Sequence, residues 1–163
     1  MKYLLIIVFL ISAAGTAQDL NAIRSAYPKA VESAEITAQL DGELAAVNAS
    51  DKPVLLAYKG AVLTLKAKFA KRKKDKLDFF KEGIALIDGA IQVAPQSIEI
   101  HLVRMSVQEN SPRFLGYHKD IAEDKAFILK DYKTISSSDL KKLVKDFVLK
   151  SGNFDDSEKK SFQ

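Results

Sequence analysis

The chain contains no cysteine, and that absence excludes several kinds of chemistry at once. Disulfides, thiolate metal sites, thiol catalysis and lipidation at a cysteine all require this side chain. Only two histidines occur, and they lack the i, i+4 spacing of a zinc-binding helix. A nucleophile elbow and a phosphate-binding glycine loop are missing as well. We therefore expect a protein that is not an enzyme, holds no cofactor or metal, and depends on packing for its stability.

Sequence patterns typical of β-strands are also scarce. The chain has no sustained alternation of apolar and polar residues, whereas apolar residues recur at three- and four-residue spacing almost throughout. This periodicity predicts an all-α fold built from antiparallel helical hairpins. The net charge of +4 is too small to indicate a nucleic-acid partner by itself.

The first seventeen residues have the layout of a secretory signal peptide. Met1 and Lys2 give a positive start, residues 3–11 form an apolar run, and residues 15–17 are small. The apolar run is about a dozen residues long, whereas a membrane-spanning helix needs roughly twenty. We expect cleavage before Gln18, export to the periplasm or the extracellular space, and no integral membrane span in the mature protein. The alternative is that the segment stays uncleaved as an anchor.

The remaining residues are about enough for one domain. We predict a single all-helical domain over residues 18–152 and a polar, frayed tail over residues 153–163. The first helix is expected from Asp19, its cap, to Tyr27, with an interruption at Pro28. A second helix would carry a stripe of apolar residues at Ile36, Leu40, Leu44 and Val47.

The clearest pair of helices lies between two prolines. Asp51 is a candidate cap and Pro53 suits a first helical turn, while Pro95 ends the second helix. Regularly spaced apolar residues line both helices: Leu55, Tyr58, Val62, Leu65 and Phe69 in the first, and Leu77, Phe80, Ile84, Ile87, Ile91 and Ala94 in the second. A short polar turn joins them, which favours an antiparallel hairpin.

Three further helical segments follow. Ser97 caps a helix that bears Ile98, Leu102 and Met105 and ends near Asn110. Another helix would place Ile121, Ile128 and Tyr132 on one face. The last helix would be capped by Ser138, lined by Leu140, Leu143, Val144 and Phe147, and ended by Gly152.

Small residues recur along this pair of helices at Gly60, Gly83 and Ala90, and Pro95 closes the second helix. In these features residues 53–95 resemble a tetratricopeptide (TPR) repeat. If Pro95 is set at the terminal proline of the repeat, Gly83 and Ala90 fall at the two small positions of the second helix and Ile87 at its large apolar position. Gly60 would be the small residue at the crossing in the first helix. Glycine inside a helix costs roughly 1 kcal/mol relative to alanine, so Gly60 and Gly83 indicate a close backbone approach.

The resemblance implies a function in binding. TPR-like stacks usually present a concave surface to a protein or peptide and perform no chemistry. We therefore expect an exported, noncatalytic scaffold with a groove for a protein or peptide partner. An alternative is that the helices enclose an apolar cavity for a small lipid-like ligand.

The candidate partner-binding residues are Tyr58 and a basic stretch in the turn of the hairpin: Lys71, Arg72, Lys73, Lys74 and Lys76. This stretch could hold an acidic partner, a polyanion or an anionic lipid surface. The simpler interpretation is a solvated turn that keeps the hairpin soluble. Lys66 and Lys68 extend this basic stretch toward the N-terminus, and only Phe69 is interleaved with the cations, too few aromatic groups for stacking on nucleic-acid bases.

Other residues are ambiguous in sequence. His101 lies beside an apolar stripe, so we expect a buried structural histidine, although a ligand or proton shuttle would have the same pattern. His118 could hold a metal only if further ligands converged on it. Phe114, Leu115 and Tyr117 would either fill the end of the core or form an exposed patch for a partner, and we favour core filling.

Overall fold

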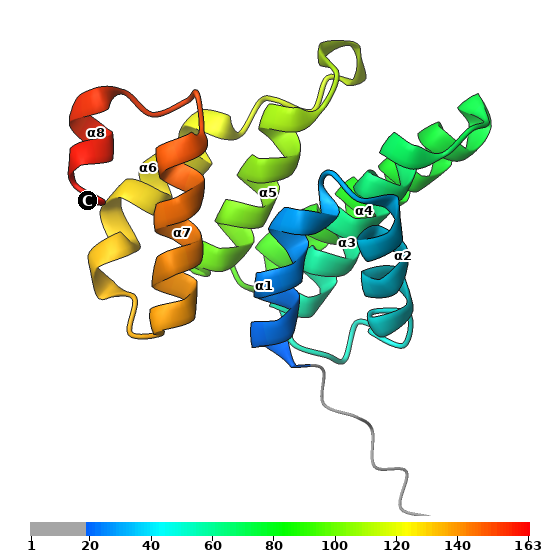
Figure 1. The fold of residues 1–163 in the computed structure, drawn as a ribbon, viewed down its shortest axis with the longest axis horizontal. Coiled ribbons are helices and arrows are strands. Elements are labelled where there is room, and N and C mark those ends of the chain that lie inside the picture. The colour runs from blue at the N-terminus through cyan, green and yellow to red at the C-terminus, as the bar shows by residue number, and fades with distance from the viewer. Residues whose placement is uncertain (1–18) are drawn as a thin grey trace, which may run out of the picture.

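The computed structural model describes residues 19–163, and this part of the chain is entirely helical, as predicted (Figure 1). It contains eight α-helices, two short 3-10 segments and, within these residues, no strand. The predicted signal peptide, residues 1–17, lies outside the described residues. None of the described helices combines the length and apolar character needed to cross a bilayer.

The first two helices form a small hairpin. Helix α1, Leu20–Ala30, begins as predicted, because the side chain of Asp19 accepts hydrogen bonds from two backbone N–H groups of its first turn. The predicted interruption at Pro28 is wrong, since the helix continues through it. Proline removes one hydrogen bond, but Ala30 beyond it is completely buried, so packing holds the last turn in place. Helix α2 runs over Ala34–Glu43.

The central hairpin consists of α3, Pro53–Phe69, and α4, Lys73–Val93 (Figure 1). Pro53 occupies the first turn of α3, as predicted, but Asp51 does not cap the helix. Its carboxylate instead accepts a hydrogen bond from the backbone of Asn48 at 2.8 Å, which closes the preceding turn. Helix α4 ends just before Pro95, as the sequence indicates.

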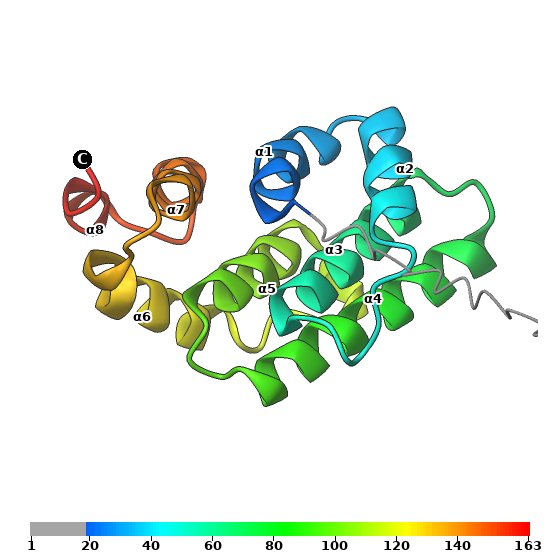
Figure 2. The same cartoon turned by 90° about the horizontal axis from the view of Figure 1, so that it is seen from below.

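Helix α5, Ile98–Asn110, lies at the centre of the molecule and is buried on nearly every side (Figure 2). One face belongs to an apolar cluster that α5 shares with α1 to α4, and the opposite face belongs to a second apolar cluster. The predicted stripe contributes Leu102 and Met105 to the second cluster. The first cluster takes Ile100, Val103 and Val107.

The second cluster is completed by the C-terminal elements. These are α6 (Ile121–Asp131), the 3-10 segment η2 (Tyr132–Thr134), α7 (Ser138–Lys150) and α8 (Asp156–Lys160). The cap of α7 is Ser137, one residue before the one predicted, because its hydroxyl accepts from Leu140 N at 3.3 Å. Helix α7 ends at Lys150, close to the predicted glycine stop.

The prediction of a frayed tail over residues 153–163 is wrong. Asp155 forms a capping box with Glu158, which starts α8. Phe154 and Phe162 are 4% and 2% exposed, and the ring of Phe162 lies 4.3 Å from that of Tyr132. Two aromatic anchors spaced across a short helix fold the tail back on the domain.

Candidate interaction surface

Two glycines set the geometry of the central hairpin. A Cβ atom at Gly83 would lie 2.5 Å from the carbonyl oxygen of Gly60 and 2.8 Å from a methyl group of Thr64. A Cβ at Gly60 would collide with the carbonyl oxygen of Gly83 and lie 2.9 Å from Ile87. The two backbones therefore touch at this point, which confirms the close approach predicted from the sequence. The crossing fixes the direction in which the turn between α3 and α4 projects.

The five predicted cations of that turn are all exposed: Lys71, Arg72, Lys73, Lys74 and Lys76. Arg72 pairs with Asp75 through two hydrogen bonds of 2.7 and 2.8 Å, and this pairing raises the pKa of the guanidinium. The four lysines make no ion pair within the described structure. We call residues 71–76 the basic turn.

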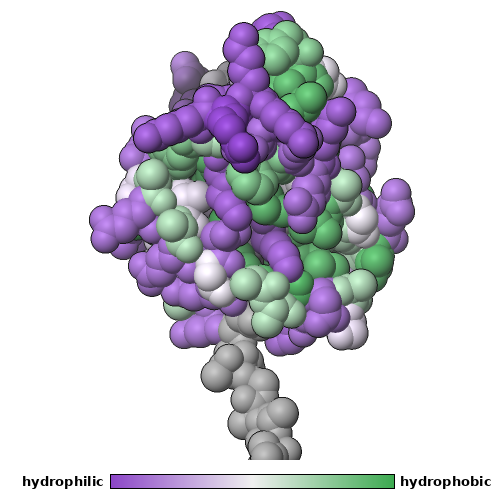
Figure 3. Space-filling model, turned by 90° about the vertical axis from the view of Figure 1, so that its right-hand side faces the viewer, coloured by the Kyte–Doolittle hydropathy of each residue, from purple (hydrophilic) through white to green (hydrophobic). Residues whose placement is uncertain are grey.

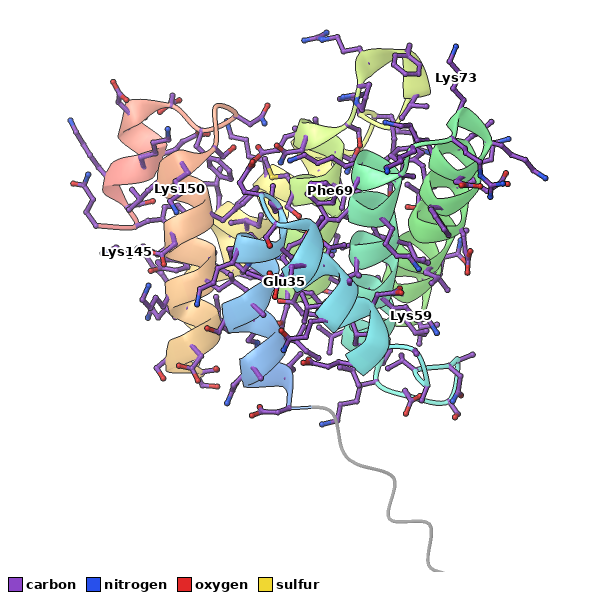
Figure 4. The ribbon with its side chains drawn as sticks, turned by 45° about the vertical axis from the view of Figure 1, so that its right-hand side comes forward. Glu35, Lys59, Phe69, Lys73, Lys145 and Lys150 are labelled. Atoms are coloured by element: carbon purple, nitrogen blue, oxygen red, sulfur yellow. The ribbon has the colours of Figure 1, made fainter. Side chains whose placement is uncertain are left out.

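A second exposed feature lies at the same end of the molecule as the basic turn. We call residues 111–117, which contain the 3-10 segment η1 (Arg113–Leu115), the aromatic loop. Figures 1 and 4 both place this loop and the α3–α4 turn, where Lys73 is labelled, at one end of the helical stack. In Figure 3 this end shows hydrophobic surface bordered by hydrophilic residues. We call the two segments together the basic end.

The aromatic loop is anchored from below. The Tyr117 ring packs edge-on against Phe80 of α4 at 6.1 Å, and its hydroxyl donates to Asp88 at 2.7 Å. Burial and this hydrogen bond raise the Tyr117 pKa. Gly116 has φ +71°, the left-handed conformation that turns the chain back after η1. The favoured prediction of core filling is right for Tyr117, which is 5% exposed.

Phe114 behaves in the opposite way. Its side chain is 87% exposed at the outer side of the anchored loop, so the prediction that it fills the core is wrong. Leu77, in the first turns of α4, is also 43% exposed. One exposed apolar side chain therefore lies on the aromatic loop, and another directly follows the basic turn.

Tyr58, the other predicted binding residue, is not on the surface. It is 0% exposed, and its ring meets Tyr27 of α1 edge-on at 5.5 Å. The Tyr58 hydroxyl donates to Glu99 at 2.9 Å, and Arg24 of α1 clamps the same carboxylate at 2.7 and 2.6 Å. Burial and the charge of Glu99 raise the Tyr58 pKa. Helix α1 thus covers the face of α3 on which a partner was expected.

The predicted structural histidine is part of a buried polar cluster. Asp124 of α6, which is 0% exposed, accepts from His101 at 2.7 Å, from Arg104 at 2.7 and 3.0 Å, and from Gln108 at 2.9 Å. The second ring nitrogen of His101 faces the carbonyl oxygen of Pro95 at 2.9 Å. Both ring nitrogens of His101 therefore have a polar partner within the protein.

Burial and the pairing with Asp124 have opposite effects on the pKa of Arg104 in this cluster. Burial alone would lower its pKa, but hydrogen bonding and the charge of Asp124 outweigh that effect, so its pKa is raised. The sequence signal was present in α5, where His101, Arg104 and Gln108 follow i, i+3, i+7 spacing on one face. Their common partner, Asp124, lies on the next helix and could not be identified from that spacing.

The remaining polar candidates have structural partners. His118 contacts the carbonyl oxygen of Ser111 at 2.9 Å, which ties the ends of the aromatic loop together. Across residues 19–163, no three His, Cys, Asp or Glu side chains are grouped so that they could hold a metal ion. Every buried side-chain nitrogen or oxygen in this region has a hydrogen-bond partner.

A hollow of about 480 Å³ lies on a different part of the surface, along α7. Its lining residues are Tyr132, Ser138, Lys141, Lys142, Lys145 and Asp146. Figure 4 shows Lys145 on this helix, well away from Lys73. The hollow is open to solvent, whereas sites for small apolar ligands enclose most of the ligand surface.

Comparison with protein-family models, curated proteins and solved structures found no match to this chain.

Proposed function

We propose that this chain is an exported, noncatalytic binding protein, in which a TPR-like helical stack serves as a rigid scaffold for a protein or peptide partner. The basic end is the surface that supports this proposal best. It combines exposed cations with exposed apolar side chains, and both are held on segments anchored to the core.

The observation that carries the proposal is the position of the cations in their helix. Lys73, Lys74 and Lys76 lie in the first turn of α4, where the N-terminal end of the helix dipole is positive. Cations there destabilise a helix by roughly 0.3–1 kcal/mol each, whereas carboxylates stabilise it. Helix stability therefore does not account for the basic turn. An anionic partner accounts for it better than a merely solvated turn does.

The interior of the protein supports a scaffold role. The buried carboxylates Glu99 and Asp124 are each engaged by an arginine and by further donors. These groups join α1 to α5 and α5 to α6, so they tie the hairpins to one another. The close glycine crossing joins α3 to α4 in the same way. A surface carried by such a framework is presented in one fixed arrangement, which reduces the entropy lost on binding.

The face of α3 that carries Tyr58 is not available to a partner in this structure. Helix α1 covers it with Arg24 and Tyr27. We therefore assign the partner to the outer surface at the basic end and not to that inner face. The alternative of an apolar-ligand carrier has no comparable support, because the hollow on α7 is open to solvent and does not enclose a ligand.

The experiment is a capture of partners by the tagged protein, compared with two charge-reversed variants. Lys73→Glu combined with Lys74→Glu changes the basic turn. Lys133→Glu combined with Lys150→Glu makes the same change in net charge at exposed positions in the C-terminal elements. We expect one protein to be retained near stoichiometry by the wild type and the control pair and lost from the first pair. Capture of no protein by the folded wild type, or equal capture by all three, would contradict the proposal.

A further inference from the structure

The basic end carries apolar groups that a purely electrostatic site would not need. Phe114 is 87% exposed on the aromatic loop, and Leu77 is 43% exposed on α4 beside the basic turn. Large aromatic side chains bury considerable apolar area when they find a partner. The Phe114 ring is exposed to solvent, although the neighbouring Tyr117 of the same loop is packed into the core.

The shape of this end limits what could cover it. The exposed groups come from two separate segments at the end of the helical stack (Figures 1 and 4). They project from that end and do not line the hollow, which lies along α7. A broad, deformable surface can contact both segments at once.

The charge at this end matches an anionic layer. Lys71, Lys73, Lys74 and Lys76 are exposed and make no ion pair within the described residues. A cluster of four to eight Lys or Arg side chains is the pattern that anionic headgroups attract, and the attraction decays within about 10 Å. A neighbouring aromatic group that enters the headgroup layer adds to the affinity.

We infer that the basic end docks on a lipid bilayer surface bearing anionic headgroups, with Phe114 inserted among the headgroups and the lysines above the phosphates. This inference rests on the proposed binding role of the basic end, and it adds anionic lipid headgroups to the groups that this end contacts. A protein attached through one inserted aromatic side chain dissociates readily from the bilayer, because stable anchoring requires more apolar area than one side chain supplies.

The chain contains no tryptophan, so a single introduced one reports its own surroundings. Phe114→Trp places that probe on the aromatic loop. Val93→Trp is the matched control, since Val93 is 71% exposed at the opposite end of α4. The probes used are vesicles of phosphatidylcholine alone and vesicles with about one third phosphatidylglycerol. All variants are purified in the exported form that the host cell produces, so that any processing of the predicted signal peptide is the same in each.

We expect a blue shift of the emission at position 114 with the anionic vesicles, none with the neutral vesicles, and none at position 93 with either. Phe114→Ala should weaken vesicle binding about tenfold, in line with the loss of one aromatic side chain. Lys73→Glu with Lys74→Glu should weaken it at least tenfold, and Lys133→Glu with Lys150→Glu less than threefold. Raising the salt concentration should weaken the wild type more than the first charge-reversed pair.

Equal shifts at positions 93 and 114, or no shift at 114 with anionic vesicles, would overturn the inference. A shift at 114 with poly-glutamate but not with anionic vesicles would also overturn it, because the end would then recognise an acidic polypeptide. That last result would leave the proposed function standing. The vesicle assay contains no protein partner, so its failure is distinct from failure of the partner capture.

Discussion

Replacing Gly83 with alanine tests the packing that directs the basic turn. Helix propensity alone favours the substitution, because alanine is about 1 kcal/mol better than glycine inside a helix. The new methyl group would lie 2.5 Å from the carbonyl oxygen of Gly60 and 2.8 Å from Thr64, and backbone cannot move aside as a flexible side chain can. Overpacking of this kind costs roughly 1–3 kcal/mol and can cost more where two helices must separate. We expect a net loss of about 2 kcal/mol in the free energy of unfolding.

Gly89 provides the matched control in the same helix. A Cβ atom there would meet no heavy atom within 4 Å. Gly89→Ala should therefore gain up to about 1 kcal/mol from helix propensity alone. Urea denaturation followed by circular dichroism measures both variants against the wild type. If Gly83→Ala is as stable as Gly89→Ala, the two backbones do not touch and the argument from close approach is wrong.

Three further predictions concern the buried groups. Asp124→Ala should lower the free energy of unfolding by about 3–5 kcal/mol in the same assay, because it leaves the Arg104 cation buried without its partner; a loss below about 1 kcal/mol would mean that water solvates the site. Burial raises the pKa of Tyr27 to about 12; the unfolded chain then loses this proton from about pH 10, and the folded state only from about pH 12. The part of the free energy of unfolding that depends on a protonated Tyr27, roughly 3 kcal/mol, should therefore be fully present below pH 10 and be lost between pH 10 and 12. A plot of stability against pH for Tyr27→Phe that falls as steeply as that of the wild type would refute this. Phe162→Ala should lower the thermal midpoint and cost about 3–5 kcal/mol, because Phe162 is 2% exposed, whereas an unchanged midpoint would show that the C-terminal segment is not docked.

Much of the fold follows from local sequence chemistry. Asp19 and Ser97 cap their helices as predicted, and Pro95 follows directly on the end of α4. The paired glycines Gly60 and Gly83 were informative because glycine is unfavourable inside a helix and so indicates a steric requirement. Helix caps and prolines depend on residues a few positions apart, and the two glycines lie within one hairpin. Such interactions between residues close in sequence can be recognised from the sequence.

The errors arise where distant segments meet. The tail after residue 152 looks polar, but its two phenylalanines find Tyr132 and the surface of α6 and α7 only in three dimensions. Tyr58 lies on an apolar stripe, and nothing local shows that Arg24 and Glu99 close over it. The pairing of charges across helices depends on tertiary packing, which periodicity within one helix does not encode.

The candidate site was only partly predictable for the same reason. The basic turn is a run of consecutive residues and could be recognised directly. The exposure of Phe114 could not, because Phe114 and Tyr117 belong to the same short loop and have similar apolar character. The contact of Tyr117 with Phe80 and Asp88 decides which of the two aromatic residues turns inward.

The most direct test of the account is photo-crosslinking from the basic end in cells that make the protein. A photoreactive phenylalanine analogue at position 114 is compared with the same analogue at position 93, which is exposed at the other end of α4. The account predicts discrete protein or lipid adducts from position 114 that are absent from position 93 and that disappear when Lys73 and Lys74 are changed to glutamate. Adducts of equal yield and identity at both positions, or adducts that survive the charge reversal, would contradict the claim that the basic end is the binding surface.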